Sequence, residues 1–539
     1  MQLFDFNIGR EGDWSHDFGV EIGTWLRNNG PELLEAAQDP ANLTLGAAAL
    51  AGSTLSCALG VALGAKTLHA TRDAVGSRPG EVDLGTLKER PLHYLTSPPV
   101  RLGWKDRVSG GLQVVGPPGA GKTVLFLDMA TKGLLQGHTV VVFEQDGDLV
   151  EQLLEYVGPL ERDGRVFLFD PADRRTMKWN PLAGDPEQVG QRMVDTLNSI
   201  SDSHDFYKNL GEDVCRNLTA LALAYAGHTG QQPHVKMLLG FLSDHDGLES
   251  KLSAQRDEAG RVRVRATFLE DGGDLKVWLE QEFLSWDRKT RLNYLLGFRN
   301  LLRKLLSSDK VIEALTPEPG EATLDLGEAL STGGLVILKA SSRDFGIEAS
   351  EFLLSCLLQA FQQETLRRDQ RRRRPVEAYI DEAHVILGRK NTTVADSFGR
   401  WVVQARKFNV AAHIGHQSFH QLPETLQGTL DTSMRNKILF GGLHDADARH
   451  AQALLGHVKR RKIEYREVEG GRPGSGSRQK FTRTVEEPYY SLSEIESLPA
   501  RRAILRARKG EVQLPPRTVH VGAPISPRQF GKKFRGGDS

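Results

Sequence analysis

The sequence predicts an α/β fold built around a mostly parallel sheet. Short apolar runs with the composition of buried strands alternate with helical segments along much of the chain. A glycine-rich turn, residues 116–123, stands between one such run and a helical segment. A long stretch of helical periodicity, with no convincing strand, interrupts the alternation at residues 183–330. We therefore expect one sheet domain with an inserted all-α domain.

The glycine-rich turn consists of Gly116, Pro117, Pro118, Gly119, Ala120, Gly121, Lys122 and Thr123. It follows the apolar run Leu112–Val115, so its glycines lie where a strand turns into a helix. Glycines let the backbone curl with its N–H groups inward, and the following helix adds its positive end, so such a P-loop cradles a polyphosphate. We predict that Lys122 neutralises phosphate charge and that the Thr123 hydroxyl holds Mg²⁺. A turn without nucleotide is the disfavoured alternative, because every fixed position of the motif is present.

Composition limits the other possibilities. With 539 residues, the chain can bury a large core and is expected to form two soluble domains. Lysine and arginine balance aspartate and glutamate at 69 each, but residues 1–42 carry a net charge of −6 and the residues from Lys459 onward a net charge of +10. The basic end is the better neighbour for a polyanion. The three cysteines are too few and too scattered for a disulfide framework or a zinc site.

An uncharged run precedes the sheet domain. Residues 43–65 hold no charged side chain and are long enough to cross a bilayer as a helix. Small residues recur every fourth position, at Gly52, Ser56, Gly60 and Gly64, and permit close helix packing. We predict a single transmembrane helix in the inner or cell membrane; a buried soluble helix is the alternative. Basic residues follow the run and acidic residues precede it, which favours a cytoplasmic location for the bulk of the chain.

Two carboxylates complete the predicted site. Asp381 and Glu382 follow the apolar run Ala378–Ile380. We expect Asp381 to hold Mg²⁺ through its water shell and Glu382 to orient or deprotonate the attacking water. This short motif is weak alone and strong beside an intact P-loop. The letters Asp-Glu-Ala-His also suggest a helicase, but Lys122 and Asp381 lie too far apart for a compact helicase core, and no arginine-rich helicase motif follows.

A helix, a turn and a strand follow the carboxylates, over residues 399–418. Gln417 falls at the carboxyl tip of the strand, where parallel sheets place their ligand contacts. Arg406 lies on the turn before that strand. Gln417 is a candidate sensor of the γ-phosphate, and Arg406 is a candidate contact to a neighbouring subunit's nucleotide. On residue type alone, each is more often structural.

The motif order resembles that of the conjugative coupling ATPases, the TraD/TraG-type proteins of type IV secretion in the HerA/FtsK group of DNA pumps. The order comprises the P-loop, Asn180–Leu182, the helical insertion, Asp381–Glu382, Arg406–Lys407, Gln417–Ser418 and Asn436–Phe440. The resemblance spans about residues 95–525. Two features depart from the family pattern: one membrane helix stands where members have two, and Glu144–Asp148 replaces an Asp-Pro-Lys-Gly-Glu motif.

The resemblance implies a hexameric, membrane-anchored, RecA-like motor that uses ATP and Mg²⁺. It implies that the motor drives single-stranded DNA, with a relaxase or other attached cargo, toward the components of a type IV secretion channel. By motif position it also implies that Arg406 acts in trans as an arginine finger and that Gln417 senses the γ-phosphate. Three alternatives stay open: a DNA pump unrelated to secretion, an exporter of protein effectors, and a docking receptor with slow ATP hydrolysis.

The expected organisation has six segments. Its C-terminal part includes a basic hairpin around the glycine-rich residues 470–477, which either lines a pore or is merely solvated. The segments are an acidic stretch at 1–42, a transmembrane helix at 43–68, the first part of a nucleotide-binding domain at 69–182, the all-α insertion at 183–330, the second part of the nucleotide-binding domain at 331–525, and a disordered basic tail at 526–539.

Overall fold

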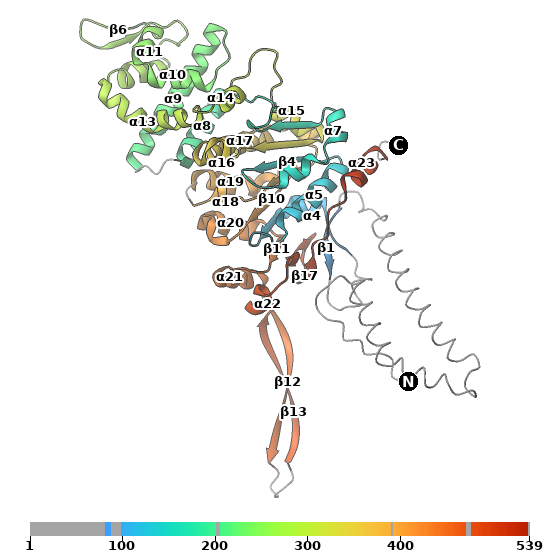
Figure 1. Cartoon of the computed structure of the whole chain (residues 1–539). Coiled ribbons are helices and arrows are strands. Elements are labelled where there is room, and N and C mark those ends of the chain that lie inside the picture. The colour runs from blue at the N-terminus through green and yellow to red at the C-terminus, as the bar shows by residue number, and fades with distance from the viewer. Residues whose placement is uncertain (1–80, 88–98, 201–204, 390–391, 470–475, 537–539) are drawn as a thin grey trace. The chain divides into compact units, whose positions relative to one another are not determined.

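The protein is represented by a computed structural model that describes residues 81–87, 99–200, 205–389, 392–469 and 476–536 (Figure 1). The predicted acidic stretch and transmembrane helix lie outside these residues. Within the described ranges, no helix combines the length and the apolar composition needed to cross a bilayer. The chain divides into two compact units, and residues 79–85 and 100–539 form the second. Apart from Thr86, Leu87 and Pro99, which are assigned to the first unit, the residues described below belong to the second.

Eleven of the described strands form one sheet, in the order β2-β1-β17-β14-β11-β3-β10-β9-β4-β8-β5. Their bounds are β1 Glu81–Leu87, β2 Pro99–Gly103, β3 Leu112–Val115, β4 Thr139–Glu144, β5 Val166–Phe169, β8 Leu335–Lys339, β9 Val376–Ile380, β10 Val410–His416, β11 Lys437–Phe440, β14 Arg502–Arg506 and β17 Arg517–His520. The pairs from β11 to β5 are all parallel. The predicted parallel α/β fold is therefore confirmed.

The sheet extends beyond its parallel part in a way that the sequence analysis did not predict. β14 pairs antiparallel with β11, and β17 pairs antiparallel with β14. The three central residues of β14 are buried, but arginines flank them on both sides. Three apolar residues are too few to predict a strand from sequence alone. The hydrogen bonds of β14 to β11 stabilise the strand. The parallel strands still end at one edge, which brings the loops after β3, β9 and β10 together.

Helices cover both faces of the sheet. They are α4 Trp104–Gly110, α5 Lys122–Leu135, α6 Leu149–Leu154, α7 Gly158–Arg162, α15 Leu326–Thr332, α16 Ser342–Phe345, α17 Ile347–Arg367, α18 His384–Leu387, α19 Thr392–Ala405, α20 Glu424–Ser433, α21 Asp445–Leu455 and α22 Leu492–Glu496, with 3₁₀ turns η2 Gln370–Arg372, η3 Arg406–Phe408 and η4 Phe419–Gln421. Side chains alternate between the faces of a strand. Accordingly, Phe143 of β4 packs on Phe361 of α17, whereas Tyr379 of β9 packs on Phe126 of α5.

The segment between β5 and β8 is mostly helical, as predicted. Its elements are α8 Pro186–Ile200, α9 Asp205–Thr229, α10 Val235–Ser243, α11 His245–Lys251, α12 Asp274–Trp278, the π-helix η1 Leu279–Phe283, α13 Arg288–Leu305 and α14 Asp309–Leu315. The expectation of no strand was wrong, because β6 Ala254–Arg256 and β7 Val262–Val264 form a small antiparallel pair. One apolar core joins Leu221 and Leu238 of these helices to Phe143 and Leu338 of the sheet. A separate all-α domain at 183–330 stays a prediction.

The C-terminal part contains a long ribbon and a helix. Strands β12 His457–Glu469 and β13 Gly476–Pro488 pair antiparallel and form the predicted hairpin, which Figure 1 shows leaving the sheet. A two-stranded pair, β15 Arg508–Lys509 and β16 Val512–Gln513, follows. The predicted disorder of the tail was wrong, since Pro527–Gly536 forms helix α23. Its Phe530 is fully buried against Tyr156, so one aromatic anchor stabilises a segment with few other apolar residues.

Candidate active site

The P-loop connects β3 to α5 at the carboxyl edge of the sheet. Gly119 and Gly121 adopt φ angles of 75° and 113°, which side chains other than glycine rarely tolerate. A Cβ added at Gly116 would lie 2.6 Å from Cβ of Phe440 on β11, so this position needs glycine for close packing. The loop therefore curls tightly in front of the first turn of α5, which is the geometry that a polyphosphate requires.

The Lys122 side chain folds back over the loop. Its Nζ donates hydrogen bonds to the carbonyl oxygens of Gly116, at 2.8 Å, and Pro117, at 3.1 Å. Burial lowers the pKa of Lys122, and the nearby carboxylates of Asp381 and Glu382 oppose that decrease. The ammonium is thus held inside the loop, where a phosphate oxygen can replace the carbonyl oxygens as its partner.

Thr123 and Asp381 meet across the sheet edge. Asp381 follows the last residue of β9, and its Oδ2 accepts a hydrogen bond from the Thr123 hydroxyl at 3.1 Å. Burial raises the pKa of the Asp381 carboxyl, and Lys122 opposes that increase. A hydroxyl and a carboxylate oxygen at this spacing are the hard ligands that Mg²⁺ prefers, so the residues fit this ion.

Glu382 and Gln417 lie together at the tips of neighbouring strands. Nε2 of Gln417 donates to Oε1 of Glu382 at 3.2 Å. Glu382 has a φ of 55°, which is strained for a residue with a side chain. The next backbone N–H, that of Ala383, donates to the carbonyl of Gly415 on β10 at 2.7 Å and so holds the turn in place. The structure thus gathers Lys122, Thr123, Asp381, Glu382 and Gln417 at one edge.

Arg406 lies at the opposite edge of the same sheet. It belongs to η3, which directly precedes β10, whereas Gln417 directly follows β10. The seven residues of β10 span roughly 20 Å at about 3.3 Å per residue. The Arg406 side chain is exposed. It cannot reach the nucleotide site of its own chain without rearrangement of the sheet, and it is accessible to a second copy.

Sequence reasoning missed a buried polar chain beside the site. Lys437 of β11 donates to Oε1 of Gln113 on β3 at 2.6 Å, and Nε2 of Gln113 lies 3.0 Å from Nε2 of His416. Burial lowers the pKa of Lys437 to about 8 and that of His416 to about 4. His416 directly precedes Gln417, so the chain connects the P-loop strand to the strand that carries Gln417. Nothing local in the sequence marks these partners, because they lie on three strands far apart in the chain.

A second buried network surrounds Glu377 on β9. Its carboxylate accepts hydrogen bonds from Arg107 Nη1 and the Tyr379 hydroxyl, both at 2.7 Å, and lies 2.6 Å from Nδ1 of His138. Although burial by itself raises the pKa of Glu377, Arg107 and His138 hold that pKa well below its ordinary value. This network fixes the strand that carries Asp381 to the helix that precedes the P-loop.

Part of the chain matches a known protein family. Residues 100–231, which contain the P-loop, match the family described as the type IV secretion-system coupling protein DNA-binding domain. The match covers this part of the chain and shows its similarity to the type IV coupling proteins. It confirms the resemblance that the motif order suggested. The matched residues include strands β3, β4 and β5 of the parallel sheet and helices α8 and α9 of the segment that follows. None of the curated proteins matches the chain.

Solved coupling proteins share the fold. The unbound bacterial conjugative coupling protein TrwBdeltaN70 superposes with a TM-score of 0.57 at 18% identity, over 83% of this chain and 95% of that chain. The plasmid coupling protein TrwB in complex with ADP and Mg²⁺ gives a TM-score of 0.56 at 19% identity, over 84% and 96% of the two chains. VirB4 of Thermoanaerobacter pseudethanolicus gives 0.50 at 12% identity, over 84% and 99%.

Proposed function

We propose that this protein is an ATP-driven coupling protein that moves DNA and its attached cargo toward a type IV secretion channel. The observation that carries the proposal is the convergence of Lys122, Thr123, Asp381, Glu382 and Gln417 at one sheet edge, in front of a P-loop. The coupling-protein match over residues 100–231 supports the cellular role. Two solved structures of the plasmid coupling protein TrwB support the cofactors, because they are complexes with a non-hydrolysable ATP analogue and with ADP and Mg²⁺.

Each residue has a distinct task in this mechanism. The P-loop N–H groups and Lys122 would bind the β- and γ-phosphates of ATP, and Thr123 and Asp381 would hold Mg²⁺. Mg²⁺, when bound, neutralises phosphate charge that develops during hydrolysis. Glu382 orients the attacking water and accepts its proton, while Gln417 positions the Glu382 carboxylate and contacts the γ-phosphate.

A ring completes the site. The P-loop lies at the carboxyl edge of the sheet and Arg406 at the amino edge, so a head-to-tail contact between copies brings each Arg406 to a neighbour's nucleotide. Head-to-tail interfaces close into rings when the rotation permits. We propose a homo-hexamer in which Arg406 stabilises the transferring phosphoryl group in trans. Anchoring of the ring in the inner membrane by residues 43–65 belongs to the same proposal.

DNA is the proposed cargo, bound without regard to base sequence. The strands of the hairpin carry exposed cations near the body of the protein, including Lys459, Arg460 and Arg461. Exposed lysines and arginines at this density bind phosphate backbones through counterion release. Single-stranded DNA suits the proposal, and the attached relaxase or effector travels with it.

Two substitutions test the hydrolytic part of the proposal. Lys122→Ala is expected to abolish ATP turnover, because it removes the cation that binds the phosphates. Glu382→Gln is expected to bind ATP normally and to hydrolyse it at least about 100-fold more slowly, since only the carboxylate that accepts the proton is lost. The measurements are the steady-state phosphate release and the Kd of a fluorescent ATP analogue. Normal turnover by Glu382→Gln would assign the base to another residue.

A further inference from the structure

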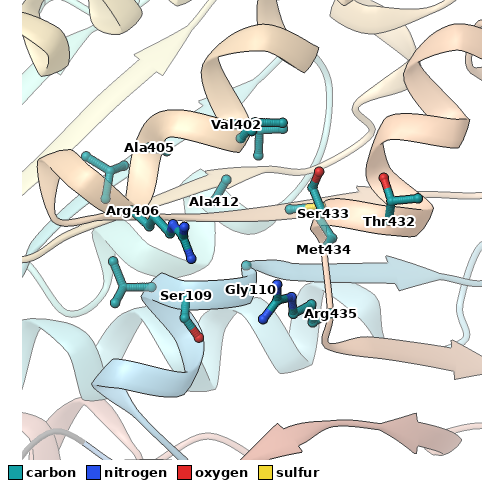
Figure 2. A pocket seen from close by; sticks show the side chains of 14 residues that line it. Ser109, Gly110, Val402, Ala405, Arg406, Ala412, Thr432, Ser433, Met434 and Arg435 are labelled. Carbon is teal, nitrogen blue, oxygen red and sulfur yellow. The ribbon is translucent and has the colours of Figure 1, made fainter. Parts of the chain in front are cut away.

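The amino edge of the sheet contains a cavity that the mechanism above uses only in part. A cavity of about 170 Å³ lies between the end of α4, the turn at Arg406 and the segment that follows α20. Two of its lining residues are arginines, Arg406 and Arg435 (Figure 2). Ser109, Thr432 and Ser433 add hydroxyl groups, and none of the described residues that line it is acidic. The cavity therefore offers cations and hydrogen-bond donors to an anion.

Neither arginine has an ionic partner among the residues that the structure describes. Within the described part of the chain, the guanidinium groups of Arg406 and Arg435 make no hydrogen bond or salt bridge, whereas nearby arginines such as Arg368 and Arg373 donate to backbone carbonyls. Figure 2 shows both groups on the side of the cavity that faces Ser109 and Gly110. Two like charges that share a cavity repel each other until an anion joins them.

Rigid backbone holds both groups in place. Arg406 stands on a turn whose carbonyls accept hydrogen bonds from two neighbouring arginines: Arg373 Nη1 donates to the Lys407 carbonyl at 2.6 Å, and Arg368 Nη1 donates to the Phe408 carbonyl at 3.2 Å. The backbone N–H of Arg435 donates to the Gly110 carbonyl at 2.8 Å. A Cβ added at Gly110 would lie 3.0 Å from Cβ of Arg435, so glycine permits this close approach.

From these observations we infer that Arg435 acts together with Arg406 on the neighbouring subunit's nucleotide. The two guanidinium groups form a subsite for the terminal phosphoryl group, and Arg435 is a second arginine supplied in trans. The inference rests on the proposed ring. Pockets that enclose a whole drug-sized ligand have about 300–1,000 Å³, so a cavity of about 170 Å³ suits one phosphoryl group and not a complete nucleotide.

A purely structural explanation makes a different prediction. Arg406 directly follows the last residue of α19, and Arg435 lies two residues beyond the last residue of α20. Cations near helix C-termini stabilise the helix dipole. If this were their only role, substitution of Arg435 would lower thermal stability and leave the turnover of ATP unchanged. The two explanations therefore separate in a kinetic experiment.

The test uses the full-length chain in assembled rings. Arg435→Ala is expected to lower kcat at least about 10-fold and to leave KM for ATP within about twofold, because the lost contact forms only in the transition state. Mixing with Lys122→Ala chains should restore part of the turnover, since those chains supply an intact Arg435 to their neighbours. The matched control is Arg449→Ala, which removes an exposed arginine of α21 that pairs with Asp445 and should behave as wild type.

The outcomes distinguish this inference from the proposed function. The inference is overturned if Arg435→Ala, in intact rings, hydrolyses ATP within twofold of the wild-type rate. It is also overturned if Arg435→Ala loses turnover and mixing with Lys122→Ala chains does not restore it. Arg406→Ala, measured in parallel, tests the ring itself. If its ATP turnover is lost and mixing with Lys122→Ala chains restores part of it, an arginine acts in trans, independently of the result for Arg435. If Arg435→Ala does not assemble, Arg435→Lys replaces it. A lysine keeps the charge but not the bidentate geometry, so a loss of at least about threefold is expected, and full turnover overturns the inference.

Discussion

At the scale of single residues, Glu144 stands apart from the other carboxylates near the site. It ends β4, next to the strand that carries Asp381, and its two oxygens accept the backbone N–H groups of Leu149, at 2.8 Å, and Val150, at 3.1 Å. Burial nevertheless raises the pKa of Glu144 to about 7, against the lowering effect of these two bonds. The carboxyl group therefore binds a proton near neutral pH.

This raised pKa predicts a dependence of stability on pH. The folded state binds the proton of Glu144 up to about pH 7, whereas an unfolded chain releases it near pH 4.5. The associated stability is therefore present below about pH 4.5 and is lost as the pH rises through 7, by about 3 kcal/mol in total. Glu144→Gln is expected to flatten the decrease in the free energy of unfolding between pH 5 and 8. Urea unfolding at four pH values measures this free energy of unfolding for both proteins.

The control for this prediction is Glu155→Gln, which changes an exposed glutamate that follows the same helix, α6. It should leave the pH dependence unchanged. A Glu144→Gln protein with the slope of the wild type would mean that the carboxyl of Glu144 is ionised at pH 5 and that other groups cause the slope.

The residues that sequence reasoning found share one property. Lys122, Thr123, Asp381 and Glu382 stand in short motifs whose spacing along the chain is set by local backbone geometry. Gln113, His416 and Lys437 were missed because each is a single polar residue outside any local catalytic motif, and only the order of the strands makes them partners. Arg435 was missed for the same reason, since its cavity is built from segments far apart in the sequence.

At the scale of elements, α23 shows how a single anchor changes the outcome. Among thirteen residues after Ser526, only two are aromatic, which predicted disorder. In the structure Phe530 lies in a buried site against Tyr156. The guanidinium of Arg165 lies over the ring of Phe534, with its Cζ 5.3 Å from the ring centroid. Composition gives the average apolar content but not the presence of a pocket that receives one ring. The core strands were predictable because their apolar runs are continuous.

Phe530→Ala tests this anchor. Removing a fully buried phenylalanine costs about 3–5 kcal/mol, and here the loss should appear locally as detachment of α23. We expect rapid removal of the C-terminal peptide by limited proteolysis, with the rest of the chain intact. The exposed Lys533→Ala on the same helix is the control. Equal proteolysis of the two variants would indicate that Phe530 does not hold the helix.

The hairpin carries a prediction on DNA binding. Lys459, Arg460 and Arg461 are exposed on β12, and replacing all three with alanine should weaken binding of single-stranded DNA independently of its sequence. At about 0.7 per phosphate contact, the slope of log K against log salt should fall by about 2. The matched control replaces three exposed cations of α23, Arg528, Lys532 and Lys533, with alanine. An equal loss of DNA affinity in the control would show that positive charge promotes DNA binding wherever it lies on the protein, and would contradict a role specific to the hairpin.

At the scale of the whole molecule, the sheet separates the two groups of residues that the proposed ring would bring together. Its carboxyl edge carries the P-loop and the two carboxylates, and its amino edge carries Arg406 and Arg435. The edges lie roughly 20 Å apart, from the rise per strand residue, so in our proposal the two arginines act on the site of a neighbouring subunit. If ATP hydrolysis at one site needs an arginine of the neighbouring subunit, the sites of a ring can hydrolyse ATP in a coordinated order. A DNA motor requires such coordination, and a docking receptor does not.

The rate of ATP turnover with and without DNA tests this account most directly. The full-length protein, confirmed as a hexamer, is assayed at low salt with increasing single-stranded DNA of mixed sequence, and Glu382→Gln provides the background. The account predicts that turnover rises several-fold with DNA and that the rise disappears as salt is added, because phosphate contacts are lost. Turnover by the hexamer that does not change with DNA would contradict the motor and favour a cargo-docking receptor.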